Sequence, residues 1–122
     1  MEYRIINIKD NINVVKIEDE KILIFDEQSA LDVFMSLAYE TGENRFIISK
    51  DNLIEDFFDL RTKIAGEVLQ KIINYRMKLA IIGDFSKYKS KSLRDFIYEC
   101  NSGRDIFFVE NEFEALNLLS YN

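Results

Sequence analysis

The stretch "TKIAGEVLQKIINYRMKLAIIGD" (residues 62–84) changes its hydrophobic period part-way along, and this change decides the fold. Over residues 62–75, apolar side chains recur at helical spacing and polar side chains fill the opposite face. Residues 78–84 contain the apolar run 79–82, which does not alternate with polar residues and is typical of a strand buried on both faces. A helix followed directly by a buried strand indicates part of a βαβ unit, and therefore a parallel sheet.

The same alternation extends in both directions along the chain. Asp26 is the predicted N-cap of a first helix that stops at Thr41-Gly42, and the apolar run 45–49 predicts a buried strand. Further helices and strands are expected towards the carboxyl end. They are a helix over 92–101, a strand over 105–110, and a last helix that begins at Asn111 and has Phe113, Leu116 and Leu119 as its apolar positions.

The amino-terminal residues follow a different pattern. Residues 3–8 and 12–18 are rich in β-branched side chains and flank a turn, so they predict an antiparallel hairpin. The run 21–25 is too short for its period to distinguish a third strand from a buried lead into the first helix. The expected fold is α/β, a single domain over residues 1–122 with a mixed sheet of about five strands and about four helices.

Composition limits the classes of function. A chain of 122 residues with 48% hydrophobic and 31% charged residues fits one globular domain. The net charge of −6 repels nucleic-acid phosphates, so no nucleic-acid partner is expected. The apolar runs are far shorter than the roughly 20 residues of a membrane-spanning helix, and the amino terminus does not resemble a signal peptide. We therefore expect a cytoplasmic protein with no membrane partner.

Catalytic chemistry has little support in the sequence. The chain has no histidine, which excludes Ser-His-Asp and Cys-His mechanisms, and its one cysteine, Cys100, lies on an apolar helix face typical of core packing. Asp51, Asp84 and Glu110 follow predicted strands and suggest a divalent-metal cluster, although acidic residues in such places usually cap helices. We expect no catalytic residue, no cofactor and no metal site.

The order of hairpin, helix, strand, helix, strand, helix, strand and helix resembles the STAS fold of bacterial anti-sigma-factor antagonists. In those proteins an Asp-Ser-Ser-Gly turn opens the second helix, and a partner kinase phosphorylates its serine. Here "FFDLRTKIAGEVLQ" (residues 57–70) takes that place, and Asp59 and Gly66 match the aspartate and the glycine. The switch serine is missing, and Thr62 is the only hydroxyl between the two matched residues.

The run from Phe57 to Leu119 is also similar to a bacterial family known as domain of unknown function 4180. The resemblance is close in the carboxy-terminal half and looser before it. It implies a fold and a bacterial origin, and it implies no assigned activity.

Ligands of open α/β sheets bind at the carboxyl ends of the parallel strands, which directs attention to the start of the second helix. Arg61, Thr62 and Lys63 lie there beside free helical N–H groups and would suit an anion. The simpler interpretation is that Thr62 caps the helix and both basic side chains are solvated. Gly66, inside the first turn, would allow either close packing on the sheet or access of a partner to the backbone.

Two adjacent aromatic residues, Phe57 and Phe58, interrupt an otherwise acidic connection. In an extended segment both rings cannot point inward, so one would be free for a partner or for a second copy of the chain. The loop 86–91, with Lys87 and Tyr88, is either a contact for an acidic partner or a solvated run.

The sequence thus favours a small regulatory or protein-interaction domain that acts through residues 57–66 and 84–91. Its partner is unknown, and a homodimer is one alternative. The second hypothesis is an enzyme or small-molecule binder that uses the same edge, with Asp59, Arg61, Thr62 and Asp84 around an anionic ligand. A deep pocket shared by these four residues would favour the second hypothesis, and an exposed phenylalanine would favour the first.

Overall fold

The computed structural model describes residues 1–121, which form one mixed five-stranded sheet, four α-helices and three short 3-10 turns. Asn122, the last residue of the predicted domain, lies outside the described residues. The strands are β1 (Tyr3–Lys9), β2 (Ile12–Ile17), β3 (Arg45–Ser49), β4 (Lys78–Ile82) and β5 (Ile106–Val109). The helices are α1 (Glu27–Thr41), α2 (Ile64–Asn74), α3 (Lys91–Asn101) and α4 (Glu112–Leu119), and the turns are η1 (Lys50–Asn52), η2 (Glu55–Phe58) and η3 (Leu60–Thr62).

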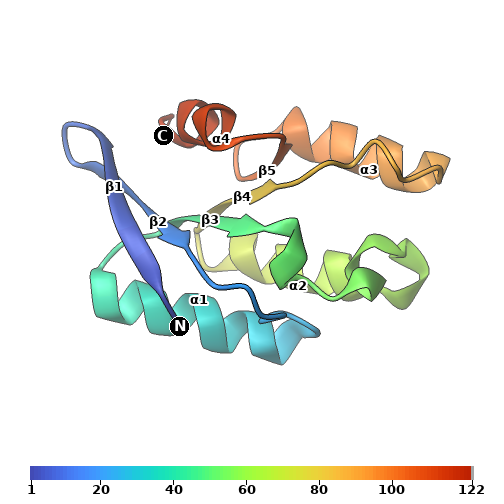
Figure 1. The fold of residues 1–122 in the computed structure, drawn as a ribbon, viewed down its shortest axis with the longest axis horizontal. Helices are drawn as coiled ribbons and strands as arrows, with labels where there is room; N and C mark the ends of the chain where they lie inside the picture. The colour runs from blue at the N-terminus through green and yellow to red at the C-terminus, as the bar shows by residue number, and fades with distance from the viewer. Residues whose placement is uncertain (122) are drawn as a thin grey trace.

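The strands lie in the order β1-β2-β3-β4-β5, so every strand is next to its neighbour in sequence. The β1 and β2 strands form the predicted antiparallel hairpin, and the pairs from β2 to β5 are parallel. Crossovers of one hand that advance in one direction leave their helices on one face of the sheet. Figure 1 shows α1 and α2 on one side of the sheet and α4 on the other. The predicted α/β class and mixed sheet are confirmed.

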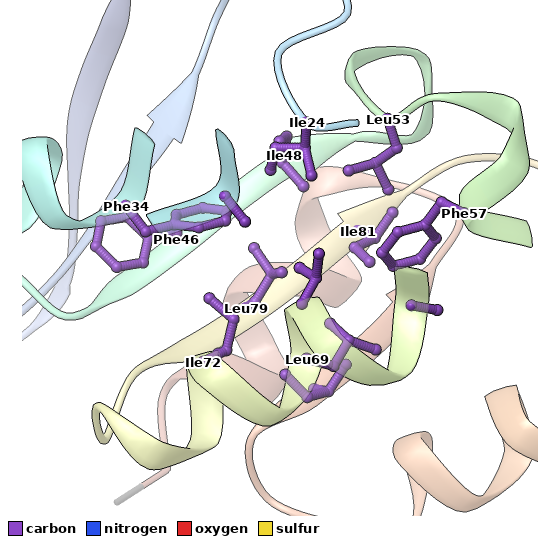
Figure 2. Packing of buried hydrophobic residues seen from close by; sticks show 14 of the residues in the cluster. Ile24, Phe34, Phe46, Ile48, Leu53, Phe57, Leu69, Ile72, Leu79 and Ile81 are labelled. Atoms are coloured by element: carbon purple, nitrogen blue, oxygen red, sulfur yellow. The ribbon is translucent and has the colours of Figure 1, made fainter. Parts of the chain in front are cut away.

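The hydrophobic core is divided by the sheet into a large and a small cluster. The large cluster lies under α1 and α2, where Phe34 and Ile72 pack against strand residues such as Phe46 and Leu79 (Figure 2). The small cluster, on the opposite face, packs Ala115 and Leu119 of α4 on the strands. Phe113 was predicted as an apolar contact of this helix, but its side chain is 81% exposed. The reason is that Ala115 and Leu119, four residues apart, form the buried face, and Phe113 points away from it.

The first helix has the predicted ends. The Ser29 N–H donates to Asp26 Oδ1 (2.8 Å), and the Asp26 N–H donates to Ser29 Oγ (3.1 Å), which makes a reciprocal cap. Gly42 ends the helix with φ of 76°, in the left-handed region that favours glycine. The boundaries of α1 are therefore set by local chemistry.

The ambiguous run 21–25 is neither a regular strand nor buried throughout: Ile24 is buried and forms a parallel bridge with Leu53, whereas Ile22 and Phe25 are 57% and 51% exposed. Asn52, whose side chain is fully buried, holds this run in place. Its Nδ2 donates to the carbonyl oxygens of Asp19 (2.7 Å) and Lys21 (2.8 Å). The first helix is thereby tied to the end of β3.

Among the described residues, none of the helices combines the length and the apolarity needed to cross a membrane.

Candidate functional site

The two segments 57–66 and 84–91, which the sequence predicted as one edge, lie side by side. The Phe58 ring stacks on Tyr88, with centroids 5.1 Å apart, and tilts against Phe85 at 5.9 Å. The edge is built from η2, η3, the start of α2, and the loop between β4 and α3. We call this surface the strand-end edge.

The prediction that one ring of the phenylalanine pair is exposed was wrong. Phe57 and Phe58 are 1% and 5% exposed, and their rings meet edge to face with centroids 5.0 Å apart. The segment is not extended, because the Phe57 N–H donates to Ile54 O (2.9 Å) and closes a 3-10 turn that directs both rings inward. Figure 2 shows Phe57 beside Ile81 in the large core. Both rings therefore anchor the turn and are not available to a partner.

Asp59 and Arg61 form an ion pair on the outer side of η3. Asp59 Oδ1 accepts from Arg61 Nε (3.0 Å) and from the Arg61 backbone N–H (3.1 Å), and Oδ2 accepts from Nη2 (2.9 Å). These hydrogen bonds lower the pKa of Asp59. The Arg61 side chain is 91% exposed, so the pair presents a charged, fixed group to solvent.

The prediction that Thr62 is the N-cap of α2 was wrong. The capping position belongs to Lys63, which has φ of 67° and makes no side-chain cap. The Thr62 hydroxyl instead lies 2.8 Å from the carbonyl oxygens of Asp56 and Asp59 and accepts weakly from the Ile64 N–H (3.3 Å). An extra 3-10 turn before the helix moved its start by one residue, so this hydroxyl fastens η3 to the preceding turn.

The glycine that permits close packing is Gly83 rather than Gly66. A Cβ added at Gly66 would meet nothing within 4 Å, so the prediction of close packing there was wrong. At Gly83, an added Cβ would lie 2.6 Å from Lys50 Cβ. Gly83 therefore lets the Lys50 side chain cross the end of β4.

Lys50 is the feature of this edge that the sequence did not single out. Its side chain is only 13% exposed, and Nζ lies 5.4 Å from the ring centroids of both Phe58 and Tyr88. Burial lowers the pKa of Lys50, and the neighbouring Lys87 adds to the effect. The signal in the sequence is a lysine directly after one parallel strand and a glycine directly after the next.

The Glu55 carboxylate is close to three polar groups around this edge, those of Tyr88, Lys50 and Lys87. Tyr88 Oη donates to Glu55 Oε1 (2.9 Å), and the Nζ atoms of Lys50 and Lys87 lie 3.8 and 3.9 Å from its carboxylate oxygens. Burial and the Glu55 carboxylate raise the pKa of Tyr88. The loop with Lys87 is thus joined to η2 by an exposed acid and is not a free run.

Asp84 has a local role in the same loop. Its Oδ1 accepts from the Ser86 N–H (3.0 Å) and from Ser86 Oγ (2.6 Å), and these bonds lower its pKa. Among residues 1–121, no three acidic, histidine or cysteine side chains come close enough to hold a metal ion. Asp51, Asp84 and Glu110 therefore do not form the cluster that was considered.

The four polar residues of the small-molecule hypothesis do not share a pocket. Asp59 and Arg61 line an open depression of about 500 Å³ next to Ser90, whereas Asp84 lines a separate depression of about 320 Å³ with Lys50. Cys100 is no better suited to chemistry, because burial raises the pKa of its thiol to about 11. The edge offers charged surfaces and shallow hollows.

The sequence of residues 9–119 matches the family described as Domain of unknown function (DUF4180). The chain belongs to this family. Neither the comparison with curated proteins nor that with solved structures found a match. The match to DUF4180 extends over most of the chain and includes the whole strand-end edge.

Proposed function

We propose that this protein is a small cytoplasmic regulatory domain of bacterial origin, a single domain of STAS-like fold, which acts by binding another protein at the strand-end edge. The observation that carries the proposal is the Asp59–Arg61 pair, which is exposed on η3 directly after the buried aromatic residues of η2. The order of hairpin and βαβ units supports the likeness to STAS domains.

The shape of the edge favours a protein partner over a small ligand. Small-molecule sites are usually concave, largely apolar, and enclose most of the ligand. The hollow beside the Asp59–Arg61 pair is open to solvent, and the polar groups of Arg61 and Ser90 share its lining with Phe58 and Leu60. Arginine is enriched among the residues that dominate protein interfaces, where flat and polar surfaces are common.

Rigidity of the edge also supports recognition. Phe57 and Phe58 fix η2 in the core, and the hydrogen bonds of Asp59 and Thr62 fix η3. A surface that is already ordered loses little conformational entropy when it binds.

The test is affinity purification from the native cells with the protein as bait. Arg61→Glu reverses the exposed charge and breaks its pair with Asp59. Arg76→Glu makes the same charge change at an exposed position just before β4 begins, at the opposite end of the sheet, and is the matched control. Circular dichroism of each variant confirms that the fold is kept.

The proposal expects partners that are recovered with wild type and Arg76→Glu and are lost with Arg61→Glu. With the partner purified, Arg61→Glu should weaken binding about tenfold or more, which corresponds to ~1.4 kcal/mol. Recovery of the same set by all three baits would remove the basis for this site.

A further inference from the structure

The first strand leaves backbone groups unpaired along one side. The β1 strand forms one edge of the sheet and pairs only with β2 (Figure 1). The Glu18 N–H donates to Glu2 O (2.8 Å), which makes this opposite pair a hydrogen-bonded one. Hydrogen-bonded pairs alternate along an antiparallel ladder, so the backbone N–H and C=O groups of Arg4 and Ile6 also point towards β2. The N–H and C=O groups of Tyr3, Ile5 and Asn7 therefore point away from the sheet.

Nothing in the described part of the chain takes up these outward groups. Within residues 1–121, no hydrogen bond from another element reaches the backbone of Tyr3, Ile5 or Asn7. The Ile5 side chain, opposite the fully buried Val15, is itself 50% exposed. An open strand edge with an exposed apolar residue is a template for another strand.

We propose that β1 pairs antiparallel with β1 of a second copy of this chain, on a two-fold axis that passes through Ile5. The two sheets become one continuous sheet, and the interface is distinct from the strand-end edge. Ile5 of each copy lies opposite Ile5 of the other, and Tyr3 lies opposite Asn7.

The register follows from geometry and charge. A two-fold axis between edge strands is perpendicular to the sheet, so opposed residues must share a face, as Ile5 does with itself. In this register both backbone groups of all three outward residues find partners. A register centred on Ile6 would place two acidic residues, Glu2 and Asp10 of the second copy, opposite each other. It would also place Tyr3 opposite Lys9, which lies beyond the bulge. The register centred on Ile5 opposes no like charges directly.

The surrounding structure limits the pairing to a short stretch. The β-bulge between Asn7 and Lys9 ends the regular edge. Arg4, the charged residue within the stretch, is already paired with Glu18 (3.0 Å) and Glu112 (2.8 Å), so its charge is compensated before a second copy approaches. Because the paired stretch is short, we expect it to bury less area than a standard interface and the dimer to dissociate in the micromolar range.

The first experiment measures the mass of the full chain by sedimentation equilibrium over micromolar to millimolar concentrations. The expected result is a rise from one chain mass to two, with no further growth. Ile5→Lys opposes two cations on the axis and should abolish the rise. Ile22→Lys, at a position of similar exposure (57%) outside β1, should leave it intact. A monomer throughout the range, as expected if the edge instead serves another protein's strand, overturns the proposal.

The second experiment tests the register in a Cys100→Ala background, where an added cysteine has no intramolecular partner. Opposed residues of a hydrogen-bonded pair have Cα atoms about 5.5 Å apart, within disulfide range. Ile5→Cys should form a disulfide dimer on mild oxidation at a rate at least about tenfold above that of Ile6→Cys or Tyr39→Cys. Equal rates, or faster cross-linking at Ile6, overturn the register.

Discussion

The two edge strands of the sheet differ in whether side chains hydrogen-bond to their outward backbone groups. At β5, the side-chain amide of Asn101 makes the hydrogen bonds that a neighbouring strand would make. Its Nδ2 donates to Phe108 O (3.1 Å), and its Oδ1 accepts from the Phe108 N–H (2.7 Å). Glu114 Oε2 then accepts from the Glu110 N–H just beyond the strand (3.1 Å). At β1, no comparable side chain within residues 1–121 covers the outward groups of Ile5. Side chains thus cover the outward groups of Phe108 and the Glu110 N–H at the β5 edge, whereas none of the described residues covers those of Ile5 at the β1 edge.

The difference teaches how such a sheet can pair without forming fibres. A sheet with two open edges can add copies without limit, whereas a sheet with one open edge pairs once and stops. The asymmetry between Asn101 and Ile5 is therefore what makes a closed dimer the expected product.

The largest expected effect comes from removing the anchor of the helix that closes β5. Leu93 of α3 is 2% exposed and packs in the large core. Leu93→Ala should lower the free energy of unfolding by about 3 kcal/mol, because it removes buried methyl groups and leaves a cavity. Urea denaturation measures this change, and Ser92→Ala is the exposed control. A loss below about 1 kcal/mol would mean that α3 is not held to the sheet through this residue.

The second effect concerns the closing side chain itself. Asn101→Ala leaves the N–H and C=O of Phe108 without their partners, and should cost about 1–2 kcal/mol of stability. The Phe108 amide should also exchange faster with deuterium. Asn117→Ala, at an exposed position of α4, is the control. Unchanged exchange at Phe108 would show that Asn101 does not close the edge.

How much of this could be read from the sequence depends on how local the cause is. Asp26, Ser29 and Gly42 lie within or next to α1, so its ends were predicted correctly. The closing role of Asn101 has a nearby partner in sequence, Phe108, but it requires the turn between α3 and β5 to bring the two together. Sequence patterns describe elements well and describe the turns between them poorly.

The strand-end edge shows the same limit. Phe57 and Phe58 were predicted to lie in an extended segment, because their apolar pattern does not indicate the 3-10 turn that buries both rings. The contact between Gly83 and Lys50 joins the ends of two different strands, so neither residue alone indicates it. The carboxyl ends of the strands were a sound place to look, and the particular side chains depended on tertiary packing.

A third, smaller effect tests how β1 is held. Glu112 of α4 accepts from Lys16 Nζ (2.6 Å) and Arg4 Nη2 (2.8 Å), and the hydrogen bond from Lys16, with the charges of both cations, lowers the pKa of Glu112. A lowered folded-state pKa contributes stability above the ordinary value of 4.5, and this contribution is lost as pH falls through the folded-state value.

Glu112→Gln should therefore be less stable than wild type at pH 7 by about 0.5–1 kcal/mol, a modest value because the group is partly exposed. The two proteins should converge in acid. Thermal unfolding at a series of pH values measures this, and Glu99→Gln on the exposed face of α3 is the control. A difference that persists at low pH would show that packing, rather than the charge of Glu112, accounts for the loss.

The smallest effect is expected for a proline at Ile5, on the outer side of β1, and a proline at Ile6, on the inner side, is its contrast. Ile5→Pro removes an N–H that points outward, so the free energy of unfolding should change by only about 0.5 kcal/mol at concentrations where the chain is monomeric. Ile6→Pro removes a bond to β2 and should cost about 3 kcal/mol. Equal losses in urea denaturation would contradict the assignment of outward groups.

The most direct measurement is amide hydrogen exchange followed residue by residue at low and high protein concentration. The Ile5 and Asn7 amides should exchange almost as freely as unprotected amides when the protein is dilute, and should slow markedly when it is concentrated. The Phe108 amide should be protected equally at both. If Ile5 and Asn7 are as protected as Phe108 in dilute solution, or if their exchange ignores concentration, the account of one closed and one open edge is wrong.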